Sequence, residues 1–335
     1  MRIVICVPQC SDITGNMVTA RRYRQALCEY GHQVVIRAVS EDGDEMRLAL
    51  MKDQPELLLL LHAYKTGKPW LCLHDCSIPA LVLLSGTDVN DGLHCPQQRE
   101  IISLVLQQAA AVLIQNPLLE QLLRRDFPHL CSNLYHLPPA ALLGEAEYPL
   151  RSRHEIADGT VVLLCAAGIR PVKGLVELIE MAAPLESACR NWLLAFCGPP
   201  LDDDYAQRFF AAVDRYRWAT YLGIIPQDAM ASVLRAVDVV VNNSFSEGLS
   251  NVLVEAACLG RPLLARDIPG NRPLVKHGVN GLLYNDSRDF VAAACALIDK
   301  ADLRRQLSVP DDTFSSQTEA RILNEICCRA GTCRP

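Results

Sequence analysis

Residues Val237 to Ala256 read VDVVVNNSFSEGLSNVLVEA and contain a strand, a polar loop and the start of a helix. The β-branched run Val237–Asn242 is typical of a buried strand, whereas the apolar residues after Ser250 recur at helical spacing. Serine is a preferred N-cap residue, and the backbone N–H groups from Asn251 onward find no acceptor within the helix itself. The stretch therefore predicts a strand–loop–helix unit of an α/β protein, with an anion site at the N-terminus of the helix.

Similar units precede and follow this one. The segment Val18–Tyr30 places Ala20, Tyr23 and Leu27 on one helical face and is followed by Gly31, a residue type that ends helices. Strands that alternate with helices favour a parallel, doubly wound sheet. The other predicted strands are Ile3–Val7, Val34–Val39, Leu57–Leu61, Ala80–Leu84, Val112–Gln115, Val161–Cys165, Leu193–Cys197, Tyr221–Leu222 and Leu263–Ala265.

The alternation is interrupted once, by the polar segment Gly144–Gly159, which is typical of a linker. We therefore predict two Rossmann-like, doubly wound α/β domains, over residues 1–148 and 149–312. A last helix over residues 313–330 is expected to pack back on the first domain. Parallel sheets bind ligands at the carboxyl ends of their strands, so two such domains predict a ligand cleft between them.

Composition restricts the classes of function. The chain has 335 residues, 50% of them apolar, and a net charge of −6, which gives no basic footprint for a nucleic acid. The first apolar run ends at Pro8 without a cleavage site for a signal peptide, and the longest one, Leu57–Leu61, is too short to span a membrane. We expect a cytoplasmic protein without a transmembrane segment, whose 15 cysteines are reduced.

Two carboxylates accompany the predicted anion site. Glu247 precedes the helix in the loop, and Glu255 lies about one turn inside it. Carboxylates repel phosphate but accept hydrogen bonds from hydroxyl groups, whereas helix amides bind phosphate. This combination suits a diphosphate that carries a ribose on one side and a sugar on the other.

With these residues, the segment from about Leu193 to Tyr284 resembles the family 4 retaining glycosyltransferases of the GT-B fold. The resemblance continues through Gly260-Arg261-Pro262, Ile268-Pro269-Gly270-Asn271 and Gly278-Val279-Asn280-Gly281-Leu282-Leu283. It implies transfer of a sugar from a nucleotide-sugar donor, with retention at the anomeric carbon. It also implies that Glu255 binds the ribose and that Glu247 contacts the donor sugar. The sugar and the β-phosphate would be held by Gly248, Leu249, Ser250 and Asn251.

A second family feature is a pair of cations that neutralises the diphosphate. Here it reads Gly168-Ile169-Arg170-Pro171-Val172-Lys173-Gly174, directly after a predicted strand. Two cations at the carboxyl end of a strand suit a leaving diphosphate, because negative charge accumulates on it. Arg170 is displaced by one position from the family pattern and its spacing to Lys173 is shorter. The alternative interpretation is that Arg170 and Lys173 are solvated cations on a loop and do not bind a diphosphate.

The resemblance is weaker in the first half of the chain. The segment Asp12-Ile13-Thr14-Gly15-Asn16 follows the first strand, where the family places a glycine loop near the donor phosphates, so Gly15 and Asn16 are predicted donor contacts. His62 ends the third strand, where relatives have a histidine that binds the transferred sugar; the alternative is a plain hydrogen-bonded side chain. Ser85 replaces a histidine of some relatives. Gly15 to Arg22 is also similar to the selenosugar synthases.

No metal or cofactor is predicted. The acidic run Asp202–Asp204 occupies a predicted helix N-terminus, which favours acids in any case, and Cys72-Leu73-His74-Asp75-Cys76 lacks the spacing and the partner pair of a zinc site. The resemblance implies a UDP- or GDP-sugar as the donor substrate and an unidentified acceptor, either a small molecule or a glycoconjugate. It also implies transfer of a hexose or an N-acetylhexosamine, with Arg170, Lys173, Glu247 and His62 as the expected catalytic residues.

Two alternatives remain at this point. A protein that binds nucleotide sugar without turnover would fit the altered spacing between the cations and the serine at position 85. An enzyme that forms a selenosugar or thiosugar would fit the partial similarity to the selenosugar synthases.

Overall fold

A computed structural model describes residues 1–9, 15–73, 77–84 and 86–332. The chain forms two compact units, one of Met1–Ala140 with Phe314–Pro335 and one of Ala141–Thr313. The division precedes the expected boundary at residues 148 and 149. Residues just beyond Ala141 already bond to the second unit, because Ala146 N–H donates to the carbonyl of Asp228 and Tyr148 N–H donates to Oγ of Ser232.

The first unit contains a six-stranded sheet in which every paired neighbour is parallel. The strand order is β2-β1-β3-β4-β5-β6, so the direction of winding reverses between β1 and β3. The strands are β1 (Arg2–Pro8), β2 (Gln33–Val39), β3 (Leu57–Leu61), β4 (Ala80–Leu84), β5 (Ala111–Ile114) and β6 (Leu134–His136).

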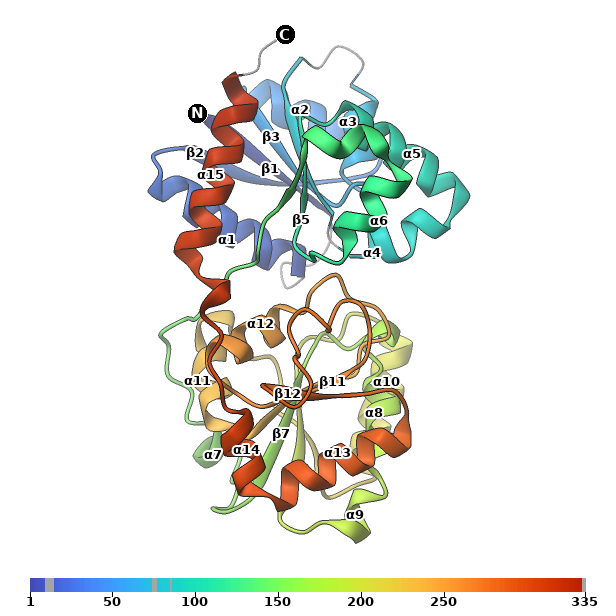
Figure 1. The fold of residues 1–335 in the computed structure, drawn as a ribbon, viewed down its shortest axis with the longest axis vertical. Coiled ribbons are helices and arrows are strands. Elements are labelled where there is room, and N and C mark those ends of the chain that lie inside the picture. The colour runs from blue at the N-terminus through green and yellow to red at the C-terminus, as the bar shows by residue number, and fades with distance from the viewer. Residues whose placement is uncertain (10–14, 74–76, 85, 333–335) are drawn as a thin grey trace. The chain divides into compact units, whose positions relative to one another are not determined.

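Apolar clusters line both sides of this sheet, as expected where helices cover the two faces. On one side, α15 (Ser316–Thr332) lies alongside α1 (Gly15–Glu29), as Figure 1 shows for the red and the blue helix. Buried Arg22 donates from Nε to Glu319 at 2.7 Å and joins the two helices. The remaining helices of the unit are α2 (Asp44–Asp53), α3 (Gly67–Leu71), α4 (Thr87–Asn90), α5 (Pro96–Gln108) and α6 (Leu119–Asp126).

The second unit contains another six-stranded sheet with parallel neighbours, in the order β12-β11-β10-β7-β8-β9. Its winding reverses between β7 and β10. The strands are β7 (Val161–Ala166), β8 (Trp192–Cys197), β9 (Ala219–Tyr221), β10 (Val239–Asn242), β11 (Leu263–Arg266) and β12 (Gly281–Tyr284). The helices are α7 (Leu150–Arg153), α8 (Leu175–Ala182), α9 (Leu185–Ala188), α10 (Asp203–Asp214), α11 (Met230–Ala236), α12 (Asn251–Cys258), α13 (Ser287–Asp299) and α14 (Ala301–Leu307).

The predicted α/β class is confirmed, with two local corrections. The sequence predicts a helix over Lys173–Leu185, but Lys173 ends the 3-10 turn η3 (Pro171–Lys173), and Gly174, with φ +60°, turns the chain before α8 begins. The first helix begins at Gly15 and not at Val18. Within the described residues, no helix is both long enough and apolar enough to cross a membrane.

Candidate active site

The predicted site residues of the second unit follow two neighbouring strands. β7 leads into the loop that carries Arg170 and Lys173, and β10 leads into the loop that carries Glu247. These strands pair directly, through Val239 with Leu163 and Val240 with Leu164. The winding reverses between them, and ligands of open α/β sheets bind at the carboxyl ends of strands at such a point.

Lys173 and Glu247 form a nearly buried ion pair. The Nζ atom of Lys173 lies 2.5 Å from Oε1 of Glu247, and the two side chains are 15% and 11% exposed. Ser244 donates from Oγ to the same carboxylate oxygen at 2.6 Å. Burial acts to raise the pKa of Glu247, but the charge of Lys173 and the bonds from Lys173, Ser244 and Asn242 outweigh it, so that the pKa is lowered. Glu247 is therefore held as a carboxylate beside a cation.

The segment Ile268-Pro269-Gly270-Asn271 packs against Glu247. A Cβ atom at Gly270 would lie 2.3 Å from the carbonyl oxygen of Glu247 and 2.7 Å from its Cβ, so only glycine fits at this distance. Asn271 is fully buried and donates from Nδ2 to Oδ1 of Asn242 at 3.1 Å. The segment thus packs against the backbone of Glu247 and binds the end of β10.

Ser250 occupies the N-cap position of α12, as predicted. Its side chain does not, however, accept a capping hydrogen bond from a backbone N–H of the helix. Its Oγ atom accepts a hydrogen bond from Nδ2 of Asn242 at 3.2 Å instead. The predicted donor contacts Gly248 and Leu249 lie in the preceding loop, and Asn251 is the first residue of the helix.

Glu255 lies inside α12 and is 3% exposed. Its Oε1 atom accepts a hydrogen bond from Nε2 of Gln227 at 2.7 Å. Gln227 begins the 3-10 turn η4 (Gln227–Ala229), which follows β9 in the chain. The carboxylate predicted to bind a ribose is therefore oriented by a neighbour that the sequence did not indicate.

Arg170 differs from Lys173 in its surroundings. It is exposed and extended in backbone conformation, just before η3. None of the described residues forms an ion pair with it, whereas Lys173 is held by Glu247. The structure thus brings Lys173, Glu247 and Ser250 into one bonded cluster and leaves Arg170 outside that cluster.

His62 directly follows β3 in the first unit, as predicted. It is 4% exposed and has φ +108°, a strained conformation for a residue with a side chain. Its N–H donates to the carbonyl of Leu83, and its own carbonyl accepts from both N and Oγ1 of Thr66. These bonds hold the strained backbone in place.

The ring of His62 has a defined tautomer. The backbone N–H of Lys65 donates to Nδ1 at 3.1 Å, which places the proton of the neutral ring on Nε2. Burial lowers the pKa of His62, although Asp88, with Oδ2 at 4.0 Å from Nδ1, acts to raise it. Asp88 itself accepts backbone N–H bonds from Ala63, Gly86 and Val89. Burial outweighs Asp88, so the pKa of His62 is lowered and the neutral ring is favoured.

The predicted loop before α1 is described only in part. Gly15 and Asn16 form the first turn of α1, after β1, the strand that pairs with β3. This corrects their expected place in a loop. Asp12, Ile13, Thr14 and Ser85 lie outside the described residues, as do His74, Asp75 and Cys76 of the cysteine segment.

The acidic run has a structural role. Asp202 is the N-cap of α10, and its carboxylate accepts the backbone N–H of Tyr205 at 2.9 Å. Asp203 and Asp204 lie in the first turn, where a helix favours acids. Among the described residues, no group of three or more His, Cys, Asp or Glu side chains could hold a metal ion.

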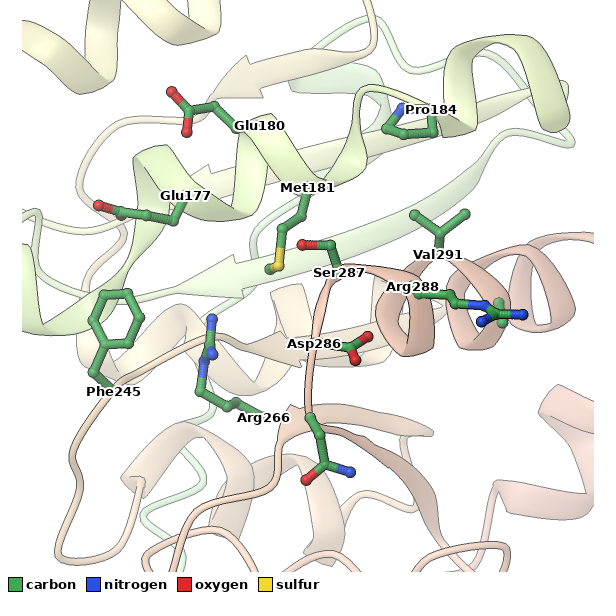
Figure 2. A pocket seen from close by; sticks show the side chains of 12 residues that line it. Glu177, Glu180, Met181, Pro184, Phe245, Arg266, Asp286, Ser287, Arg288 and Val291 are labelled. Carbon is green, nitrogen blue, oxygen red and sulfur yellow. The ribbon is translucent and has the colours of Figure 1, made fainter.

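A cavity of about 930 Å³ lies between α8 and α13 of the second unit (Figure 2). Phe245 and Arg266 form part of its wall, with the guanidinium 4.8 Å from the centre of the ring. The described residues that line it include Glu177, Met181, Asp286, Arg288 and Val291, but none of the predicted site residues.

Several functional neighbours were missed at the sequence level: Asn242, Asn243, Ser244, Gln227 and Asn271. The signal for three of them was the polar run Asn242-Asn243-Ser244 at the carboxyl end of an apolar strand. Gln227 carries no such signal, because its partner Glu255 is 28 residues away in the sequence.

Part of the chain matches a known protein family. Residues 160–300 match the family described as "Glycosyl transferases group 1". The chain is 27% identical over 305 residues to glycosyltransferase 1 domain-containing protein 1 of Xenopus tropicalis, covering 88% of this chain and 87% of that protein.

Solved structures share the fold over the whole chain. Sucrose-phosphate synthase of Thermosynechococcus elongatus superposes with a TM-score of 0.78 at 16% identity, covering 98% of this chain and 97% of that chain. HepE of Anabaena, solved with UDP and glucose, gives 0.73 at 17% identity and covers 98% of each chain. Residues 160–300 are therefore similar to the glycosyl transferases group 1 family, and the chain shares the GT-B fold of its structural neighbours.

Proposed function

We propose that this protein is a retaining, metal-independent glycosyltransferase that acts in the cytoplasm on a UDP- or GDP-sugar. The ion pair of Lys173 and Glu247 at the carboxyl ends of β7 and β10 carries the proposal. The pair places a cation that can bind the diphosphate beside a carboxylate that can accept hydrogen bonds from sugar hydroxyls. The N-terminus of α12, a further site for phosphate, begins four residues after Glu247. The structure of HepE with UDP and glucose supports a UDP-sugar as the donor, and the similarity to glycosyltransferase 1 domain-containing protein 1 supports sugar transfer.

Each group has a distinct task in this proposal. Glu255 accepts hydrogen bonds from the ribose, and Glu247 accepts them from the donor sugar. An ammonium has three N–H donors, and Lys173 directs one of them to Glu247, so the others can serve the β-phosphate. Arg170, which is exposed, contributes a second positive charge near the diphosphate.

The chemical step is a substitution at the anomeric carbon. The bond to the β-phosphate oxygen breaks while the acceptor oxygen attacks from the same face, and the acceptor proton passes to the departing phosphate. Negative charge on that phosphate is greatest as the bond breaks, so Lys173 stabilises the transition state more than the bound donor. We also propose that His62, through its neutral ring, binds a hydroxyl of the transferred sugar.

A panel of nucleotide sugars tests the proposal, with released UDP or GDP as the readout. We expect release from at least one donor, with the product retaining the anomeric configuration in NMR spectra. A protein that binds UDP or GDP but releases neither from any hexose or N-acetylhexosamine donor, with sugar, lipid or thiol acceptors, would be a binding protein without turnover. Product of inverted configuration would contradict the retaining mechanism.

A further inference from the structure

Two adjacent asparagines lie at the carboxyl end of β10: Asn242 is its last residue, and Asn243 directly follows it. Their side chains bond to different parts of the site. Asn242 donates to Oγ of Ser250 and, at 3.4 Å, to Glu247. Asn243 donates from Nδ2 to the carbonyl of Gly174 at 2.6 Å. One amide thus contacts the carboxylate side and the other contacts the lysine loop.

The lysine loop is bonded to the β10 loop on both sides of Lys173. Before it, the carbonyl of Val172 accepts the N–H of Phe245 at 2.9 Å. After it, the carbonyl of Gly174 accepts the amide of Asn243. A Cβ atom at Gly174 would lie 2.9 Å from Nδ2 of Asn243, so the contact is close as well as polar. The backbone of Lys173 is therefore fixed relative to the loop that carries Glu247.

The amide of Asn243 is itself held in one orientation. It is 1% exposed, and its Oδ1 atom accepts from the hydroxyl of Tyr284 at 2.6 Å and from Nη2 of Arg266 at 2.9 Å. Arg266 is in turn placed beside Phe245 (Figure 2). Because two donors point at the oxygen, the NH₂ group must face Gly174.

We propose that Asn243 is a positioning residue that directs Lys173 toward the β-phosphate of the donor, an inference that rests on the proposed function. Without its bond to Gly174, the lysine loop loses one of its two attachments to β10. Lys173 then keeps its charge and its partner Glu247, but its ammonium is no longer held where the diphosphate lies. The nucleoside, which depends on Glu255, is bound as before.

The test compares nucleotides that differ by one phosphate. Titration calorimetry gives the dissociation constants of UDP and GDP and of the corresponding monophosphates. The diphosphate preference is the dissociation constant of the monophosphate divided by that of the diphosphate of the same nucleoside. The variants are Asn243→Asp, which keeps an acceptor for Arg266 and Tyr284 but cannot donate to Gly174, and Asn243→Ser, which is uncharged and too short to reach it.

A matched control is available in the same unit. Asn280 is 4% exposed, donates from Nδ2 to the carbonyl of Leu274 at 2.9 Å, and accepts the N–H of Lys276 at 2.8 Å. Asn280→Asp breaks the same kind of buried bond away from the lysine loop. It should lower the thermal midpoint while leaving the diphosphate preference unchanged.

We expect both Asn243 variants to reduce the diphosphate preference by about tenfold, the effect of a charge-assisted bond that is no longer well placed, with monophosphate affinity little altered. An unchanged preference in either folded variant overturns the inference. A loss of preference in the Asn280 control of the same size also overturns it, because the effect would then follow from stability. A wild-type chain that binds neither UDP nor GDP overturns the proposed function and the inference together.

A separate observation concerns two thiols of the second unit. Cys189 directly follows α9, and Cys295 lies in α13; their sulfur atoms are 3.2 Å apart. Cys189 is 5% exposed, and Cys295 is partly exposed and packs against the same apolar core. A disulfide bond is about 2.05 Å long, so the sulfurs need to approach by only about 1 Å.

We infer that Cys189 and Cys295 are a disulfide-forming pair for a small disulfide oxidant such as oxidised glutathione. Cys295 is the more accessible thiol and attacks the oxidant as a thiolate, releasing one reduced thiol and forming a mixed disulfide. Cys189 then loses its proton, attacks the sulfur of Cys295 and releases the second reduced thiol. Burial, followed by the neighbouring thiol, raises the pKa of Cys189 to about 12, which makes this second step slow.

The native protein is incubated with oxidised glutathione, denatured, alkylated and digested without reduction. We expect a linked peptide that joins residues 189 and 295, its loss in Cys295→Ser, and a higher thermal midpoint that returns to the starting value with dithiothreitol. Cys258, a partly exposed thiol of the same unit, serves as the control and should carry at most glutathione. Recovery of Cys189 and Cys295 as alkylated thiols or as glutathione adducts overturns the inference.

Discussion

Lys173 and Glu247 are 74 residues apart in the chain, yet their side chains meet at 2.5 Å where β7 and β10 end side by side. The pair joins the loops that follow these two strands. Each side chain fixes the orientation of the other, and a fixed orientation reduces the reorganisation that a catalytic group needs during the reaction.

The first prediction concerns catalysis by this pair. Lys173→Ala should lower kcat by about 100-fold or more, because a preorganised cation is removed from the leaving group. The donor KM should change less, since other phosphate contacts remain. Steady-state nucleotide release measures both constants. Lys276→Ala removes an exposed cation paired with Asp311 and should leave kcat unchanged. A Lys173→Ala enzyme with normal kcat and a raised KM would make Lys173 a binding group only.

The pair also predicts a pH dependence of stability. The pKa of Glu247 is lowered in the folded state, so its contribution is fully present above the pKa of an unfolded glutamate, about 4.3, and is lost as pH falls through the folded value. Lys173→Ala should lower the free energy of unfolding by about 3 kcal/mol at pH 7, because it leaves a buried carboxylate without its cation. The difference in the free energy of unfolding between wild type and Lys173→Ala should be smaller at pH 3.

Urea unfolding at both pH values measures this difference. Fluorescence of Trp192 and Trp218 reports on the second unit, and a Trp70→Phe background removes the signal of the first. A difference between wild type and Lys173→Ala that is constant from pH 7 to pH 3 would contradict the assigned role of the ion pair.

The next prediction concerns the ribose. Glu255→Ala should weaken UDP or GDP binding by about 2 kcal/mol or more, the scale of hydrogen bonds to a charged group. Gln227→Ala, which removes only the neighbour that orients Glu255, should have a smaller effect. Calorimetry on folded variants provides both values. Unchanged affinity in Glu255→Ala would exclude the ribose role.

Catalysis without a metal is a further prediction. Donor cleavage should continue in excess EDTA, because Lys173, Arg170 and the first amides of α12 supply the positive charge. The control is a metal-dependent sugar transferase that loses activity in the same buffer. Activity that EDTA abolishes and magnesium or manganese restores would overturn the assignment.

The last prediction concerns the attachment of α15. Arg22 and Glu319 form an ion pair whose side chains are 6% and 1% exposed. Glu319→Leu leaves the cation of Arg22 buried without its partner and should lower the free energy of unfolding by about 3–5 kcal/mol. The double variant Arg22→Met with Glu319→Leu should recover much of this loss. Hydrogen exchange of the amides in α15 reports the detachment of the helix. Losses that simply add in the double variant would show that the two side chains act independently.

Much of the fold could be predicted from local patterns. β3 and β4 were predicted to the residue, because each is a run of five apolar residues between polar or turn-forming segments. The short strands β6 and β12 were not predicted as strands. Leu134–His136 has only three residues, and Gly281–Tyr284 begins with a glycine, so neither shows a clear period.

The site could be predicted in its chemistry but not in its connections. The residue types of Lys173, Glu247 and Glu255 indicated a cation and two hydroxyl acceptors, but the sequence could not show that Lys173 and Glu247 form a pair. Such pairing depends on the order of strands in the sheet, which places β10 beside β7. The turn at Gly174 was also missed, because a Lys-Gly step is compatible with a helix start as well as with a left-handed residue.

The position of α15 has a consequence for synthesis of the chain. Leu323 and Ile326 of this helix complete an apolar cluster against α1 and the strands of the first unit, yet they are made after the whole second unit. At about 5–20 residues per second, the nascent first unit displays the uncovered apolar face for roughly ten to thirty seconds while residues 141–313 are translated. The second unit can thus reach its native fold before the first unit is complete.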